Sequence, residues 1–265
     1  LHLNDECIKH DYEKAIYYLK LSIQLNNSFA GQMLGYIYLS GIAVKQDIQK
    51  SIYYFEISAK CENADSLFAL GELYSNGLYI DANIQKAIDY FLRCINIQKK
   101  LFVSKNVNDI SNSYFGYQYN NYYYASNNSL GLIYITILND KDLAMKYIKE
   151  SGLNEFPYGQ NNLGLMYQFY FDNIQNAEYY YSRASKNNFA LAFFNLGQLK
   201  EKAGEINESI DLFISASDHE NYPLVFHNIE YIDERLDISK LFITSLANLK
   251  LVNFYYSQEE RSFEK

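Results

Sequence analysis

Apolar and small residues recur along this chain with helical spacing and at a nearly constant interval. The clearest stretch is 28–60, whose landmarks return 36 residues later, as Gly35 does at Gly71. The main landmark is a Leu-Gly pair, found at Leu34-Gly35, Leu70-Gly71, Leu130-Gly131, Leu163-Gly164 and Leu196-Gly197. A fixed interval of this size is typical of a solenoid, in which each helical hairpin buries its apolar face only against its neighbours. The pattern predicts an all-α solenoid of stacked antiparallel helix pairs.

The second helix of each expected pair carries two columns of small residues, seven positions apart. The first column is Ala15, Ser51, Ala87, Ala144, Ala177 and Ser209, and the second is Ser22, Ser58, Cys94, Ser151, Ala184 and Ala216. Two helical turns separate the columns, so both lie on one stripe, where small side chains let another helix approach closely. We expect the large residues between them, such as Tyr54 and Phe55, to fill the space between hairpins.

The glycines of the Leu-Gly pairs stand inside expected helices. Glycine costs about 1 kcal/mol there relative to alanine, so its recurrence at one position needs a packing reason. We expect each glycine to mark a close contact with the partner helix. A tyrosine follows three residues later in four units, and Lys200 interrupts that column in the fifth. Gly41 and Gly77, in the turns of the first two units, suit helix ends in the left-handed conformation.

Spacing locates one insertion. From the small residue of one unit to the glycine of the next is 20 positions at four junctions, as from Ser51 to Gly71, but 44 from Ala87 to Gly131. The extra 24 residues fall within 97–128, a polar and aromatic stretch in which we find no helical periodicity. Such a segment is either disordered or a dedicated binding loop, and its low complexity favours disorder.

The two ends of the chain differ from its middle. Residues 11–25 read as the second helix of a unit whose first helix is missing or reduced to 1–8, and the chain opens without methionine, so we expect a fragment of a longer protein. Beyond Ser217 the Leu-Gly signature is lost. We therefore predict a repeat array over 1–217 and a helical capping segment over 218–265.

Composition narrows the possible partners and the cellular setting. Half of the residues, 49%, are apolar, and the net charge is -8, which argues against a nucleic-acid surface and favours cationic partner surfaces. The three cysteines follow no paired spacing, and no apolar run approaches a membrane span. We expect a reducing, cytoplasmic setting. Three N-x-S triplets, at Asn26, Asn127 and Asn207, leave a lumenal or secreted location as an alternative.

Catalytic and metal-binding motifs are not apparent. The chain has no Gly-rich phosphate-binding motif, and in the nearest zinc-like cluster, His219-Glu220 with His227, the two histidines are not one helical turn apart. A polar turn between helices is the better interpretation of that cluster. Cys94 occupies a small-residue column and is expected to fill the core, whereas Cys61 lies past it as a partly exposed thiol. We predict no enzymatic activity, no cofactor and no metal site.

The repeated pattern A-x-x-x-L-G-x-x-Y-x-x-G, followed by K-A/S-I-x-Y, resembles the Sel-1-like repeat, a relative of the tetratricopeptide repeat. It stands as Ala30, Leu34, Gly35, Tyr38 and Gly41 with Lys50, Ser51, Ile52 and Tyr54, and again with the Leu70-Gly71 unit. The resemblance covers roughly 11–217. It implies a right-handed superhelix that acts as an adaptor in signalling, protein quality control or host-microbe contact, sometimes fused to a catalytic domain.

The resemblance also implies where a partner would bind. In tetratricopeptide hairpins the first helices line a concave groove. Carried onto the present register, this geometry selects Gln32, Tyr36, Leu39, Phe68, Glu72, Ser75, Asn128, Leu132, Ile135, Asn161, Leu165, Gln168, Phe194, Gln198 and Glu201. The mixture of apolar and amide side chains suits an extended or helical peptide.

The function we predict is a non-catalytic protein-protein interaction scaffold that binds a protein or peptide in the concave groove. The alternative is a regulatory segment that recruits substrates for a larger multidomain enzyme such as a protein kinase. A lumenal or secreted adaptor is the third hypothesis.

Overall fold

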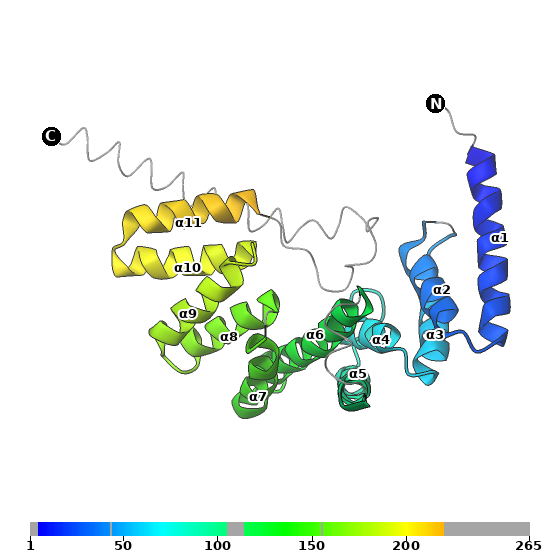
Figure 1. Ribbon diagram of the computed structural model, residues 1–265, viewed down its shortest axis with the longest axis horizontal. Helices are drawn as coiled ribbons and strands as arrows, with labels where there is room; N and C mark the ends of the chain where they lie inside the picture. Colours follow the sequence, from blue (N-terminus) through cyan, green and yellow to red (C-terminus); the bar gives the residue numbers. More distant parts are fainter. Residues whose placement is uncertain (1–4, 43, 105–113, 155, 220–265) are drawn as a thin grey trace. The chain divides into compact units, whose positions relative to one another are not determined.

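The computed structural model describes residues 5–42, 44–104, 114–154 and 156–219, and in these ranges every regular element is an α-helix (Figure 1). The prediction of an all-α fold is confirmed. The helices are α1 (Asp5–Gln24), α2 (Ser28–Ser40), α3 (Ile48–Lys60), α4 (Ala64–Asn76), α5 (Ile84–Ser104), α6 (Tyr114–Thr136), α7 (Lys141–Gly152), α8 (Pro157–Phe169), α9 (Ile174–Ser185), α10 (Ala190–Ala203) and α11 (Ile206–Asp218).

By packing, the chain divides into two compact units, unit 1 (1–133) and unit 2 (134–265). In unit 1, α2 pairs with α3 and α4 with α5, and in unit 2, α8 pairs with α9 and α10 with α11. Successive pairs also touch, α3 against α4 and α9 against α10. This order of contacts is that of an all-α solenoid. The right-handed superhelix stays a prediction.

In four of the five Leu-Gly pairs, the glycine lies under an aromatic ring of the second helix. A Cβ atom added to Gly35 would stand 2.5 Å from the ring of Phe55, a distance that real Cβ atoms do not reach. The same pairing recurs as Gly71 with Phe91, Gly164 with Tyr181 and Gly197 with Phe213. The predicted close contact with the partner helix is confirmed at these four positions.

Several of the large residues between the small columns pack inside their own hairpin. Others, such as Ile148 and Tyr180, lie in a cluster shared by two hairpins, so the prediction that these residues fill the space between hairpins holds only for part of them. The ring of Phe55 covers Gly35, and Tyr54 stacks on Tyr38 with ring centroids 5.5 Å apart. Stacked tyrosines recur as Tyr74 with Tyr90, Tyr134 with Tyr147 and Tyr167 with Tyr180. The reason is that the glycine of the first helix leaves room for the ring of the second helix, as Gly35 does for Phe55. The tyrosine that precedes this ring, Tyr54, then lies against the tyrosine three residues after the glycine, Tyr38.

Beyond α1, the small columns are buried in the helix pairs, as expected, and two of their serines bind the first helix directly. Ser51 Oγ donates a hydrogen bond to the Gly35 carbonyl at 2.8 Å, and Ser58 Oγ donates to the Ser28 carbonyl at 2.7 Å. Because 51 faces 35 and 58 faces 28, α2 and α3 are antiparallel. Ala15 departs from its column and is exposed, because no first helix of its own unit precedes α1 among the described residues.

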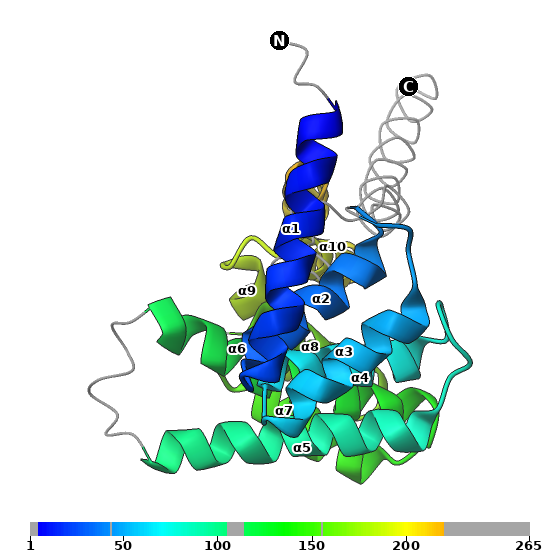
Figure 2. The ribbon, with the colours of Figure 1, turned by 90° about the vertical axis from the view of Figure 1, so that its right-hand side faces the viewer.

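The predicted insertion is largely helical, which corrects the expectation of a stretch without helical structure. α5 continues to Ser104 and α6 begins at Tyr114, so only 105–113 of the inserted stretch lies outside the described residues. Figure 2 shows α5 running well past the ends of α3 and α4. Asparagine and tyrosine do not form helices strongly, and tertiary packing decides for them here: Tyr123, Ala125 and Ser126 are buried.

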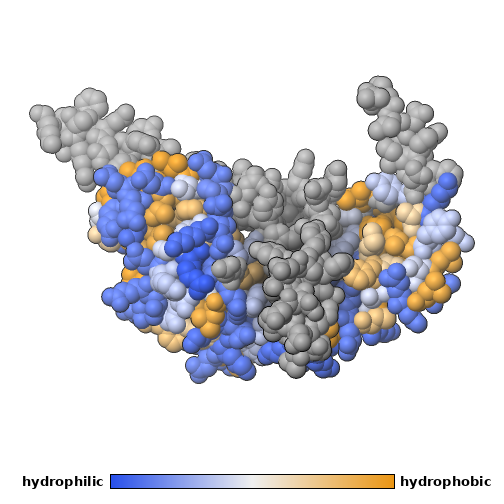
Figure 3. Space-filling view, viewed as in Figure 1, coloured by the Kyte–Doolittle hydropathy of each residue, from blue (hydrophilic) through white to orange (hydrophobic). Residues whose placement is uncertain are grey.

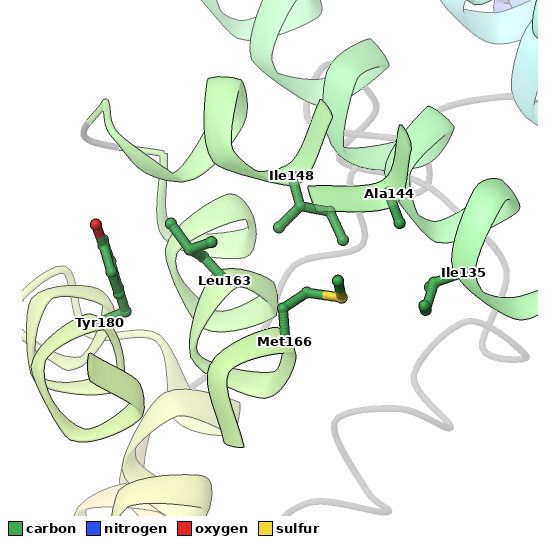
Figure 4. Close-up of a cluster of buried hydrophobic side chains, with 6 residues drawn as sticks. All are labelled: Ile135, Ala144, Ile148, Leu163, Met166 and Tyr180. Atoms are coloured by element: carbon green, nitrogen blue, oxygen red, sulfur yellow. The ribbon is translucent and has the colours of Figure 1, made fainter. Parts of the chain in front are cut away.

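The core of unit 2 illustrates the packing between successive hairpins. Ile135, Ala144, Ile148, Leu163, Met166 and Tyr180 form one buried cluster drawn from four helices (Figure 4). Ala144 is fully buried, as a column of small residues requires. The cluster therefore joins α7 to the α8–α9 pair.

Turn chemistry follows the sequence closely. Gly41 and Gly77 end α2 and α4 with φ of 72° and 67°, in the left-handed conformation that glycine adopts without strain, so this prediction is confirmed. Asp47 and Asn63 cap the helices that follow. The capping segment expected over 218–265 lies outside the described residues apart from Asp218 and His219.

Candidate interaction surface

The first helices of unit 1 are joined by polar side chains rather than by apolar ones alone. Asp65, in the first turn of α4, accepts a hydrogen bond from Gln32 Nε2 at 2.7 Å and further bonds from the hydroxyls of Tyr36 and Tyr122. Gln32 and Tyr36 belong to α2, and Tyr122 belongs to α6. One carboxylate therefore ties three first helices together.

A second carboxylate lies two helical turns further along the same stripe of α4. Glu72 Oε1 accepts a hydrogen bond from Ser129 Oγ of α6 at 2.7 Å. Asp65 and Glu72 are seven residues apart, as are their α6 partners Tyr122 and Ser129, so α4 and α6 lie parallel. We call the surface formed by Gln32, Tyr36, Asp65, Glu72, Tyr122 and Ser129 the polar face of unit 1.

Aromatic side chains hold the polar face in place from below. Phe68, 1% exposed, has its ring centroid 5.7 Å from that of Tyr122 and 5.8 Å from that of Phe91. The edge of one ring meets the face of the other between Tyr36 and Phe55, 4.9 Å apart. Tilted and edge-to-face contacts of this kind fix ring orientation. The two tyrosine hydroxyls are thus positioned by packing before any partner arrives.

Burial changes the acid-base properties of this face. Burial, together with the neighbouring Asp65 carboxylate, raises the pKa of Tyr36 well above its ordinary value, so the hydroxyl stays protonated and donates a hydrogen bond to Asp65. Burial also raises the pKa of Glu72, although the Ser129 hydrogen bond opposes that shift. The Glu72 carboxylate is therefore poorly solvated while remaining partly exposed.

In unit 2 the corresponding helices are joined by neutral groups. Asn195 Nδ2 of α10 donates a hydrogen bond to Asn161 Oδ1 of α8 at 2.9 Å, in a buried site. Within the α8–α9 hairpin, Tyr181 donates a hydrogen bond from its hydroxyl to Gln168 Oε1 at 2.7 Å. On the side of the molecule seen in Figure 3, hydrophilic residues alternate with smaller hydrophobic groups on each unit.

The structure separates the predicted groove residues into two groups. Nine are at least partly exposed: Gln32, Tyr36, Glu72, Ser75, Leu132, Leu165, Gln168, Gln198 and Glu201. Six are buried: Leu39, Phe68, Asn128, Ile135, Asn161 and Phe194. Buried members such as Phe68 and Asn161 pack or bond between neighbouring helices, so they support the surface rather than present a side chain to a partner. That a partner binds here stays a prediction.

Three members of the polar face, Asp65, Tyr122 and Ser129, were not among the predicted residues. Tyr122 and Ser129 fall at the edge of the stretch taken for an insertion, and Asp65 stands five residues before the Leu-Gly pair. The available signal was the shared spacing of seven residues on two helices. It becomes meaningful only once residues 114–136 are known to be helical.

Other candidate chemistry finds no support among the described residues. There, no three His, Cys, Asp or Glu side chains are grouped so that they could hold a metal ion. Cys94 fills the core as expected, and burial raises the pKa of its thiol to about 12, whereas Cys61 is exposed. His219 stacks on Phe193, and His227 lies outside the described residues.

None of the helices in the described ranges has the length and apolar character needed to cross a membrane. Asn127, one of the three N-x-S asparagines, is 2% exposed, and its Nδ2 donates to the Tyr123 carbonyl. The folded chain therefore does not offer Asn127 as a glycan acceptor, whereas Asn26 and Asn207 are exposed.

Comparisons with known proteins agree with this fold. A family model described as Sel1 repeat matches residues 1–27, 32–63, 64–93 and 157–189. Among solved structures, a Sel1 repeat protein from Oxalobacter formigenes superposes with a TM-score of 0.55 at 15% identity, over 89% of this chain and 98% of that one. No curated protein matches the sequence.

Two more distant structures were also found. One is c5321, a protective antigen with an SLR fold from uropathogenic Escherichia coli, with a TM-score of 0.33 at 17% identity over 91% of this chain and 67% of that chain. The other is the immunity protein Pa5087 of Pseudomonas aeruginosa, with a TM-score of 0.34 at 14% identity over 83% and 81%.

Proposed function

Because this chain belongs to the Sel1-like repeat family, whose fold serves as a scaffold for protein-protein interaction, we propose that it is a non-catalytic adaptor that binds a peptide segment of a partner on the first helices of its repeats. The polar face of unit 1 is the site we favour. The exposed members of the predicted groove, such as Leu132, border it.

One observation carries this proposal. The polar face holds carboxylate, amide, hydroxyl and aromatic groups in fixed positions across three helices, through the bonds of Asp65 and Glu72. A peptide that binds such a surface meets groups that are already ordered, so little conformational entropy is lost on its side of the interface. Tyrosine is also enriched in protein interfaces.

The described residues favour binding over catalysis. Of the two cysteines whose side chains the structure describes, Cys94 is buried with a raised pKa and Cys61 is exposed at a helix end. Sel1 repeat proteins are in general interaction modules without catalytic activity. The partner's identity and a cytoplasmic location are further expectations that rest on the sequence.

The test is a peptide array screened with purified, labelled chain. Two leucines of nearly equal exposure give a matched pair of variants: Leu132, 37% exposed on α6 beside the polar face, and Leu21, 38% exposed on α1. We expect Leu132→Gln to weaken binding of the retained peptides several-fold and Leu21→Gln to leave it unchanged. If no peptide is retained, or if both variants bind as the wild type does, the proposal is wrong.

A further inference from the structure

Glu72 differs from the acidic side chains whose ion pairs are visible in the described residues. Asp47 pairs with Lys50 at 2.8 Å, and three glutamates surround Lys200. Glu72 takes part in none of the ion pairs found in the described ranges, and its carboxylate accepts one hydrogen bond, from Ser129. The hydroxyl of Ser75 donates instead to the backbone carbonyl of Glu72.

The surroundings of Glu72 make this carboxylate a strong site for a positive charge. It is partly exposed, so a ligand can reach it, yet it is shielded enough that its pKa is raised by burial. Water stabilises such a carboxylate poorly, and an opposite charge is correspondingly more effective than at an open surface. Asp65, two turns away on the same stripe, adds a second negative charge to the same face.

We propose that the polar face of unit 1 selects peptides by a cationic group, an ammonium or a guanidinium, which pairs with the carboxylate of Glu72. This inference rests on the proposed function and adds the chemistry of the partner. The aromatic rings of Tyr36 and Tyr122, next to Asp65, suit the approach of a cation. The net charge of the chain, -8, would also draw a cationic segment toward it.

The unit 2 counterpart offers a contrast in the same chain. There the buried Asn195–Asn161 bond joins two neutral amides, and Tyr181 donates to the amide of Gln168. These groups provide no negative charge. The selection of cations is therefore assigned to unit 1.

The experiment uses an array in which each peptide carries one of three residue types at the tested position: lysine or arginine, the neutral analogue norleucine or citrulline, or glutamate. Each of these forms is made with a free and with an acetylated amino terminus. The wild-type chain and two variants are compared. Glu72→Gln removes the charge from the polar face, and Glu13→Gln removes the same charge from an exposed position of α1. The acetylated arm distinguishes a side-chain cation from a terminal amine.

We expect the wild type to bind cationic forms at least tenfold more tightly than their neutral forms, and Glu13→Gln to keep this preference. Glu72→Gln should lose it while melting at the same or a higher temperature, since a purely structural role would lower the melting temperature instead. Equal binding of cationic and neutral peptides, or a preference that survives Glu72→Gln, would overturn the inference but leave the proposed function standing. Retention of no peptide at all would overturn both.

Discussion

Units 1 and 2 share one way of building a hairpin and differ in how they join hairpins side by side. In both, a glycine of the first helix lies under a ring of the second, as Gly71 lies under Phe91 and Gly164 under Tyr181. Between first helices, however, unit 1 uses the carboxylates of α4, whereas unit 2 uses a pair of asparagines. The residues that recur in every repeat determine how the two helices of a hairpin pack. The residues that differ between repeats, such as Glu72 and Asn195, determine the chemistry of the surface.

A second difference lies within unit 2 itself. Its last hairpin has Lys200 where the others have a stacked tyrosine. Lys200 Nζ lies 2.8 Å from Glu178, 3.0 Å from Glu205 and 3.4 Å from Glu208. The hydrogen bonds that Lys200 donates to Glu178 and Glu205 raise its pKa. An ion cluster thus joins α9, α10 and α11 where aromatic stacking joins the helices of other hairpins.

The largest effect is expected where the two units are alike. Gly71→Val and Gly164→Val should each destabilise their own unit by about 2 to 4 kcal/mol, because the Cβ would stand 2.5 to 2.6 Å from the ring that covers the glycine and the two methyl groups would add to the clash. Urea denaturation measures the loss in the free energy of unfolding, and hydrogen exchange in each unit shows which unit has lost stability. Unchanged stability in either unit would show that its glycine does not mark the contact.

A smaller effect is expected from the polar contacts between first helices, and its size should differ between the two units. Asp65→Asn keeps the shape of the side chain but removes the charged acceptor of three donors, and we expect it to destabilise unit 1 by about 2 kcal/mol. Asn195→Ala removes one neutral bond and should destabilise unit 2 by about 1 kcal/mol. Exchange protection of α2 and α8, compared between the two variants, tests this order. A larger loss for Asn195→Ala would contradict it.

A smaller effect is expected from the ion cluster. Lys200→Met should cost about 1 kcal/mol, because it leaves three partly exposed carboxylates facing one another, and the loss should shrink as salt is added. Lys202→Met, at an exposed position two residues away, is the matched control and should be neutral. Melting temperatures of the wild type and both variants, measured in low and in high salt, test this prediction. A cost that does not depend on salt would mean that the lysine acts through packing.

The smallest expected effect is a pH dependence confined to unit 1. Burial raises the folded-state pKa of Glu72, so the folded chain binds this proton more tightly than the unfolded chain does. From the ordinary glutamate pKa up to the raised value, the free energy of unfolding should therefore fall as pH rises, and Glu72→Gln should remove that slope. Denaturation of both proteins at several pH values measures the difference. Parallel curves would show that Glu72 is as well solvated as an exposed carboxylate.

Much of the hairpin architecture could be predicted from sequence because it depends on glycine and other small residues at fixed intervals. The glycines at 35, 71, 164 and 197 and the small residues opposite them are constraints that few other residues satisfy. The helical state of 114–136 could not be predicted in this way. Its asparagines and tyrosines have no strong helical preference, and burial of residues such as Tyr123 decides in favour of the helix.

The candidate surface was predicted only in part for a related reason. A groove position carried over from hairpin geometry gives the helix and the approximate side, and this was enough to include Gln32, Tyr36 and Glu72. It does not say which side chains a neighbouring first helix covers, so Phe68 and Asn161 were included although they are buried.

By itself, the sequence determined the class of fold, the place of the close helix contacts and the ends of α2 and α4, because each follows from local residue size or backbone freedom. Only the tertiary structure decided that Asp65 and Glu72 meet hydroxyl groups from a helix 57 residues further along the chain. Contacts at that separation depend on how successive hairpins are offset against one another, and no local pattern records that offset.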